Sequence, residues 1–161
     1  MIIKKILSLA ASIISLFILQ FIFLVNSISQ ENNIKSYSKD SGVLSLMYHR
    51  FNENKYPSTN IRMNMFDEQM KIIKNQGYEF YDPKNFLNEF NKVKKSKRIL
   101  ITIDDGFKSF YTEAWPYLKK NKIPFILFVS TEPVGKRGYM TWEEIKEIND
   151  SDLGYIGHHS H

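Results

Sequence analysis

ILITIDDGF, running from Ile99 to Phe107, joins an apolar segment to two acidic residues and a glycine. The residues from Ile99 to Ile103 form an uninterrupted β-branched and apolar run, which predicts a strand covered on both faces in a parallel sheet. Asp104 and Asp105 follow this run directly. Because ligands collect outside the carboxyl ends of the strands in α/β folds, the segment predicts a central strand that ends at a functional edge.

Strand-like and helix-like patterns alternate on both sides of this segment. Strands are predicted at Val43 to Tyr48, Tyr78 to Tyr81, Pro124 to Val129 and Gly154 to Ile156. Helices are predicted over Phe66, Met70 and Ile73, after Pro83, from Ser109 to Lys120 and from Trp142 to about Asn149. Pro116 predicts a kink or a new first turn, and Thr141 with Glu144 predicts a capping box. The alternation predicts an α/β fold, either a (β/α) barrel or an open doubly wound sheet.

The composition supports one ordinary domain with a hydrophobic core, since 43% of the 161 residues are hydrophobic. A net charge of +5 is too weak a bias to indicate a nucleic-acid partner. The chain contains no cysteine, which excludes a disulfide scaffold, a zinc ribbon and a thiol nucleophile.

The N-terminal residues 1–27 have the pattern of an export signal. Lys4 and Lys5 precede the almost unbroken apolar run from Ile6 to Val25. A cleaved signal peptide and an uncleaved membrane anchor both fit this pattern, whereas a buried core helix fits poorly because the run has no polar face. Either form delivers the rest of the chain outside the cytoplasmic membrane. Residues 28–42 are polar and predict a linker, and residues 43–161 form the folded domain.

The paired aspartates and a histidine cluster predict a metal site. Two adjacent carboxylates repel each other, and a metal on one lets both stay ionised. Alone, the pair also fits a solvated turn with a helix cap. His158, His159 and His161 come after another predicted strand and should lie at the same edge as the aspartates. Imidazole with a carboxylate is a common zinc ligand set, which favours the metal.

These segments carry a resemblance to a known family. The run from Leu100 to Phe107 resembles the TFDDG motif of the polysaccharide deacetylases, the NodB-homology domains of carbohydrate esterase family 4. The run from Gly157 to His161 resembles the start of their second, histidine-containing motif, and the segments Leu46 to Phe51 and Met140 to Trp142 agree as well. The resemblance covers Val43 to His161. It implies a distorted (β/α) barrel, incomplete in this chain, which would form the N-terminal part of a longer protein.

The resemblance also implies a role for each matching residue. Asp104 corresponds to the general base, and Asp105 and His159 correspond to ligands of a divalent metal, typically Zn²⁺. The second metal histidine would fall two residues beyond His161, and later motifs with the general acid are absent, so we expect this chain alone to be inactive. His161 serves as a ligand only if the register is shifted. The activity implied is hydrolysis of N-acetyl groups on an extracytoplasmic polysaccharide, and some members of the family act on O-acetyl esters.

Other readings of the same residues compete with this one. Phosphatases of the haloacid dehalogenase type need two aspartates separated by one residue, so the adjacent pair disfavours that class. An exported, non-catalytic carbohydrate-binding protein, or an inactive fragment of the same fold, is the main alternative. His49 follows a predicted strand, and structural hydrogen bonding is its favoured role. Trp115, Trp142 and the many tyrosines have rings that can stack on sugars, and most of them are expected in the core.

Overall fold

The computed structural model describes residues 18–22, 42–89 and 97–161. The chain divides into two units, Met1–Lys39 and Asp40–His161. Of the predicted export signal and linker, only residues 18–22, which are helical, and Gly42 are described; the remaining positions lie outside the described residues. Within the described ranges, no helix is both long enough and apolar enough to span a bilayer.

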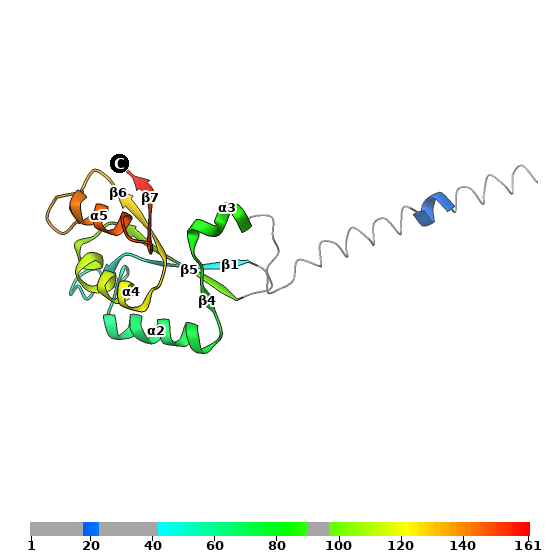
Figure 1. The fold of residues 1–161 in the computed structure, drawn as a ribbon, viewed down its shortest axis with the longest axis horizontal. Helices are drawn as coiled ribbons and strands as arrows, with labels where there is room; N and C mark the ends of the chain where they lie inside the picture. The colour runs from blue at the N-terminus through cyan, green and yellow to red at the C-terminus, as the bar shows by residue number, and fades with distance from the viewer. Residues whose placement is uncertain (1–17, 23–41, 90–96) are drawn as a thin grey trace, which may run out of the picture. The chain divides into compact units, whose positions relative to one another are not determined.

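A five-stranded, wholly parallel sheet forms the centre of the second unit (Figure 1). Its strands are β1 (Val43–Tyr48), β4 (Glu79–Phe80), β5 (Arg98–Asp105), β6 (Phe125–Ser130) and β7 (Gly154–Ser160). The order is β1-β5-β6-β7, and β4 also pairs with β5. Two short strands, β2 (Arg50–Phe51) and β3 (Asn60–Ile61), form a separate parallel pair. The predicted α/β fold with a parallel sheet is confirmed.

The helices follow the strands as the sequence predicts, with two differences. The described helices are α2 (Met63–Asn75), η1 (Pro83–Asn85), α3 (Phe86–Glu89), η2 (Phe110–Ala114), α4 (Trp115–Asn121) and α5 (Trp142–Asn149). The predicted helix from Ser109 to Lys120 is split into a π-helical turn and α4, and Pro116 lies in the first turn of α4. Proline fits there because the first turn of a helix needs no donor from its backbone nitrogen.

The second difference concerns α3. In the sequence, Phe86, Leu87, Phe90 and Val93 predict one apolar face for the helix after Pro83, yet the side chains of Phe86 and Leu87 are exposed, Leu87 to 87%. The remainder of that predicted helix lies outside the described residues.

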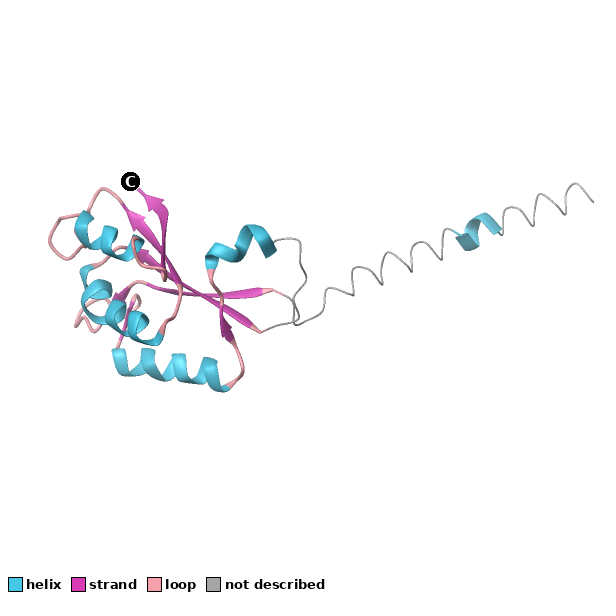
Figure 2. Cartoon of the chain, in the orientation of Figure 1, coloured by secondary structure: helices cyan, strands magenta, loops and turns pink. Residues whose placement is uncertain are grey.

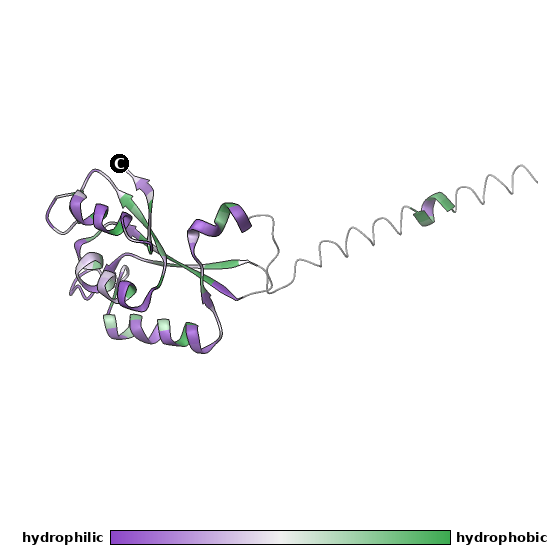
Figure 3. Cartoon of the chain, in the orientation of Figure 1, coloured by the Kyte–Doolittle hydropathy of each residue, from purple (hydrophilic) through white to green (hydrophobic). Residues whose placement is uncertain are grey.

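The core lies between the sheet and the helices α2, α4 and α5, which gather on one side of it (Figure 2). Phe66, Met70 and Ile73 of α2 are buried, as their spacing predicts. Aromatic rings meet edge to face inside this layer: Phe51 and Phe66 have centroids 5.2 Å apart, and Phe110 and Phe125 are 5.4 Å apart. Hydrophobic residues run along the central strands (Figure 3). This packing fixes the strands whose carboxyl ends carry the candidate site.

Two strands extend further than the sequence predicts. Strand β5 includes Asp104 and Asp105, which pair in register with Phe128 and Val129 of β6. Strand β7 continues past Ile156 through His158 and His159 to Ser160. Hydrogen bonding to neighbouring parallel strands sustains both extensions, and the polar residues therefore lie on the sheet itself.

Candidate functional site

The candidate site lies at the carboxyl edge of β5, β6 and β7. These three strands are neighbours and parallel, so their last residues meet. Asp105 pairs with Val129, and Val129 pairs with His158, which aligns the ends of the strands across the sheet. Figure 1 shows the C-terminus of the chain at this edge, beside the end of β6.

Backbone geometry fixes Asp105 at the point where the chain leaves β5. Asp105 has φ +74° and Gly106 has φ +77°, so two successive residues adopt the left-handed conformation. Few non-glycine residues tolerate that region, and aspartate is one of them. The backbone carbonyl of Gly106 accepts a hydrogen bond from the Met140 nitrogen at 3.0 Å, which anchors the turn.

The loop after Asp105 is held by the two flanking segments that resemble the family. Arg50 lies over the Phe107 ring, 3.4 Å from its centroid, and pairs with Glu53 at 2.8 Å. The ring of Tyr139, just before Met140, also contacts the Phe107 ring in a tilted arrangement, with centroids 4.9 Å apart. Four segments carry the family resemblance, and they are separated in the sequence. Three of them meet at this loop: Leu46 to Phe51, Leu100 to Phe107 and Met140 to Trp142. The fourth, at the end of β7, lies beside Asp104 and Asp105.

A β-bulge directs His159 toward the aspartates. Val129 pairs with His158 and Ser130 pairs with Ser160, so His159 is an extra residue on β7 with no partner on β6. Bulges of this kind change the direction of a side chain at the end of a strand. The Nε2 atom of His159 lies 3.6 Å from Asp104 Oδ2, and its Nδ1 atom lies 3.9 Å from Asp105 Oδ1. The bulge thus brings together all three residues for which the sequence predicts a role.

Asp104 is the most buried member of this group. The residue as a whole is 8% exposed. Burial raises the pKa of its carboxyl, and the charge of the neighbouring Asp105 adds to this effect. His49 and His159 act in the opposite direction and lower that pKa. Among the residues that the structure describes, Asp104 Oδ1 is buried without a hydrogen-bond partner. A buried carboxylate oxygen left in this way indicates a site for a further polar group.

Two further residues lie at the site, and the sequence predicted a chemical role for neither. His49 lies close enough to Asp104 to lower its pKa, although its predicted role was structural. Ser130, the last residue of β6, donates a hydrogen bond from Oγ to Asp105 Oδ1 at 3.1 Å. The sequence did contain a signal for Ser130, because this polar residue directly follows the predicted strand next to β5.

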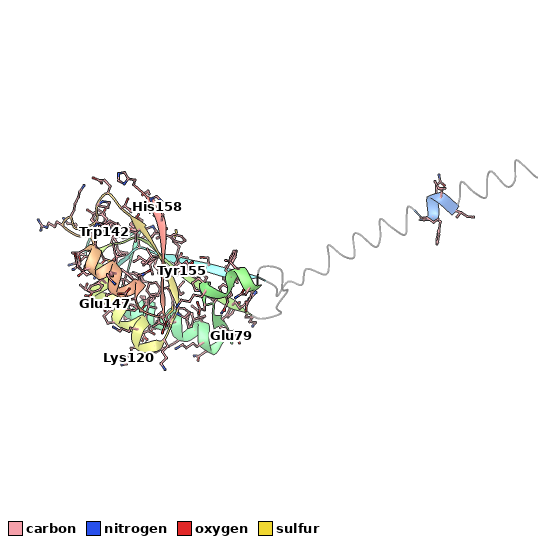
Figure 4. All side chains as sticks on the ribbon, turned by 45° about the horizontal axis from the view of Figure 1, so that its top comes forward. Glu79, Lys120, Trp142, Glu147, Tyr155 and His158 are labelled. Atoms are coloured by element: carbon pink, nitrogen blue, oxygen red, sulfur yellow. The ribbon has the colours of Figure 1, made fainter. Side chains whose placement is uncertain are left out.

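The expected cluster of three histidines does not form around the aspartates. His158 pairs with Val129 ahead of the bulge that carries His159, and Figure 4 labels His158 on that strand. The Nδ1 atom of His161 lies 2.9 Å from Thr131 Oγ1. Within the described ranges, no group of three or more His, Cys, Asp or Glu side chains is close enough to hold a metal ion.

Comparison with known proteins gives one family. The family described as "Polysaccharide deacetylase" matches residues 91–161. The chain is 30% identical over 115 residues to the putative polysaccharide deacetylase YxkH of Bacillus subtilis, covering 70% of this chain and 40% of that protein. The structure of IcaB from Ammonifex degensii superposes with a TM-score of 0.67 at 33% identity, over 74% of this chain and 53% of that one.

The chain belongs to the polysaccharide deacetylase family. It is also 28% identical over 143 residues to the poly-β-1,6-N-acetyl-D-glucosamine N-deacetylase of Staphylococcus aureus, covering 76% of this chain and 49% of that protein. The chain thus spans about half the length of the curated relatives that it matches. The similarity confirms the predicted resemblance and the predicted fold, of which this chain holds part.

The donor atoms of this polysaccharide deacetylase chain fit a divalent metal in their chemistry. A carboxylate at Asp105 and an imidazole at His159 are ligand types that zinc accepts. The His159 Nδ1 and Asp105 Oδ1 atoms lie 3.9 Å apart, and the neighbouring Asp104 has a buried oxygen without a hydrogen-bond partner among the described residues.

Proposed function

We propose that the protein is a metal-dependent hydrolase that removes N-acetyl groups from a polysaccharide by cleaving a non-peptide carbon–nitrogen bond. The observation that carries the proposal is the convergence of Asp104, Asp105 and His159 at one edge of the sheet. A relative whose name gives poly-β-1,6-N-acetyl-D-glucosamine as substrate supports an N-acetylated polymer.

Asp105 and His159 would hold the divalent metal, for which Zn²⁺ is the best match to the donor set. A bound zinc ion supplies Lewis-acid polarisation of a carbonyl and lowers the pKa of coordinated water. A catalytic zinc site takes three protein ligands, so a third is needed beside these two.

Asp104 would act as the general base. Its carboxylate lies 3.6 Å from the His159 ring, and its Oδ1 atom has no partner among the described residues. The carboxylate is therefore free to accept a proton from an attacking water molecule. Because the φ of Asp105 and the bulge at His159 hold the neighbouring groups, the base needs little rearrangement before it acts.

We further propose that the protein works outside the cytoplasmic membrane. The apolar run within residues 1–27 supports export, with the segment left in the membrane if it is not cleaved. Polymers of N-acetylated sugars are the partners expected there.

Metal titration tests the ligand assignment. Zn²⁺ binding by the full protein should weaken sharply in Asp105→Ala and in His159→Ala. His158→Ala is the matched control, since that histidine is adjacent in sequence but lies in the regular part of β7, paired with Val129 ahead of the bulge. Unchanged Zn²⁺ binding in both site variants would remove the assignment.

Acetate release from N-acetylglucosamine oligomers tests the reaction. The main alternative is a non-catalytic carbohydrate-binding protein of the same fold. It is supported by the number of metal-ligand candidates that lie side by side in the described ranges, which is two and not three. Release of acetate that depends on Zn²⁺ supports the hydrolase, whereas binding of the oligomer without acetate release supports the alternative.

A further inference from the structure

A chain of hydroxyl groups connects Asp105 to His159 across the ends of three strands. Ser130 Oγ donates to Asp105 Oδ1 at 3.1 Å and lies 3.0 Å from Ser160 Oγ. Ser160 Oγ in turn lies 3.3 Å from His159 Nδ1. Ser130 is buried, so its hydroxyl has little access to water.

Counting protons along this chain fixes its direction. An ionised carboxylate only accepts, so the single proton of the Ser130 hydroxyl goes to Asp105. Ser130 must therefore accept from Ser160, which uses the single proton of that hydroxyl. Ser160 must then accept from His159, and only an N–H at Nδ1 can donate to it. Along this chain the charge on Asp105 favours a proton on Nδ1, against the Asp104 carboxylate that lies 3.6 Å from Nε2.

This direction leaves the other ring nitrogen ready to bind a cation. In a neutral imidazole with its proton on Nδ1, Nε2 carries the free lone pair. The Nε2 atom of His159 faces Asp104, 3.6 Å from Oδ2. Metal-binding histidines commonly donate the opposite N–H to a fixed acceptor, which holds both the tautomer and the ring orientation.

We propose that Ser130 and Ser160 form a hydroxyl relay that holds His159 in its Nδ1–H tautomer and orients Asp105, making Ser130 a positioning residue for both candidate metal ligands. The role of the relay in positioning metal ligands rests on the proposed function. The hydrogen bonds of the relay are a property of the metal-free chain. No part of it requires the bound metal.

The relay is tested by ¹⁵N NMR of the imidazole nitrogens in the metal-free full chain, at a pH about two units above the ordinary histidine pKa of ~6.5. We expect His159 to carry its proton on Nδ1 in the wild type and in Ser130→Thr, which keeps the hydroxyl. Ser130→Ala and Ser160→Ala should each move the proton toward Nε2. Thr131→Ala is the nearby control, because that hydroxyl contacts His161 and the backbone carbonyl of Ser160, outside the chain of side-chain hydroxyls that leads to the His159 ring.

A Zn²⁺ titration of the same variants separates this proposal from the proposed function. Loss of an outer hydrogen-bond partner commonly lowers metal affinity by ~10- to 100-fold, and we expect a decrease of that size in Ser130→Ala but not in Ser130→Thr. A wild-type His159 protonated on Nε2, or an unchanged tautomer in both alanine variants, would overturn the relay. An Nδ1–H tautomer that depends on Ser130, in a protein that binds no Zn²⁺, would support the relay and count against the metal-dependent hydrolase.

Discussion

Substitution of Gly157 by alanine should disturb the site through the sheet, without touching any polar group. Gly157 pairs with Phe128 across β6 and β7, and a Cβ atom at this position would lie 2.5 Å from Phe128 Cδ1 and 2.7 Å from Cε1. Non-bonded carbon atoms prefer ~3.5–4.0 Å. The ring or the strand must therefore move by about 1 Å to restore that distance.

The size of the effect follows from this overlap. Overpacking of this kind costs about 1–3 kcal/mol of unfolding free energy. For a domain of this size, each kcal/mol lowers Tm by about 4 °C, so Gly157→Ala should melt about 4–12 °C below the wild type. A displacement of about 1 Å at catalytic groups can reduce rates about 10²-fold, and His159 follows Gly157 by two residues on the same strand.

A double-mutant cycle with Phe128→Leu tests the cause. Leucine is smaller than phenylalanine, and Phe128 is half-buried, so Phe128→Leu alone should cost about 1 kcal/mol. If the ring is what the new methyl group meets, the double variant should be more stable than the sum of the single changes predicts, by ~0.5–3 kcal/mol. Thermal unfolding and Zn²⁺ binding of all four proteins are the measurements. Additive losses, or a Gly157→Ala variant as stable as the wild type, would refute the steric argument.

Three further changes test other parts of the molecule. Asp104→Asn should keep Zn²⁺ binding and lose ~10²- to 10⁴-fold in acetate release, because the amide cannot accept the proton; a near wild-type rate would exclude the base role. Phe66→Ala should lower the unfolding free energy by ~3–5 kcal/mol, since Phe66 is fully buried, whereas Met65→Ala, at an exposed neighbour, should change it little; chemical denaturation compares the two. Thr141→Ala removes the capping box of α5 and should cost ~1 kcal/mol in the same assay, with Thr131→Ala as the comparison at a residue that caps no helix.

Local sequence patterns predicted the parts of the fold that depend on burial and on capping. The spacing of Phe66, Met70 and Ile73 predicted the buried face of α2, and Thr141 with Glu144 predicted the start of α5. Both features arise from residues within two turns of a helix. Their physical cause is therefore present in a short segment.

The site was harder to predict, because part of it depends on contacts between residues that are far apart in the sequence. The sequence predicted that Asp104, Asp105 and His159 would share an edge, because each follows a strand. It did not predict the bulge that leaves His159 unpaired, since the bulge arises from the register between β6 and β7. Nor did it predict Ser130, whose hydrogen bond to Asp105 joins residues 25 positions apart.

The left-handed backbone at Asp105 limits how this position can change over evolutionary time. Only glycine, asparagine and aspartate adopt φ near +74° readily, and among these only aspartate is anionic. A lineage that exchanges Asp105 for asparagine or glycine keeps the turn and the fold but gives up the charge. A single substitution can therefore produce a folded protein that lacks the anionic group. Glutamate at this position would keep the charge, but the left-handed backbone would be strained. Conformation and charge together leave aspartate as the one residue that meets both demands at this position.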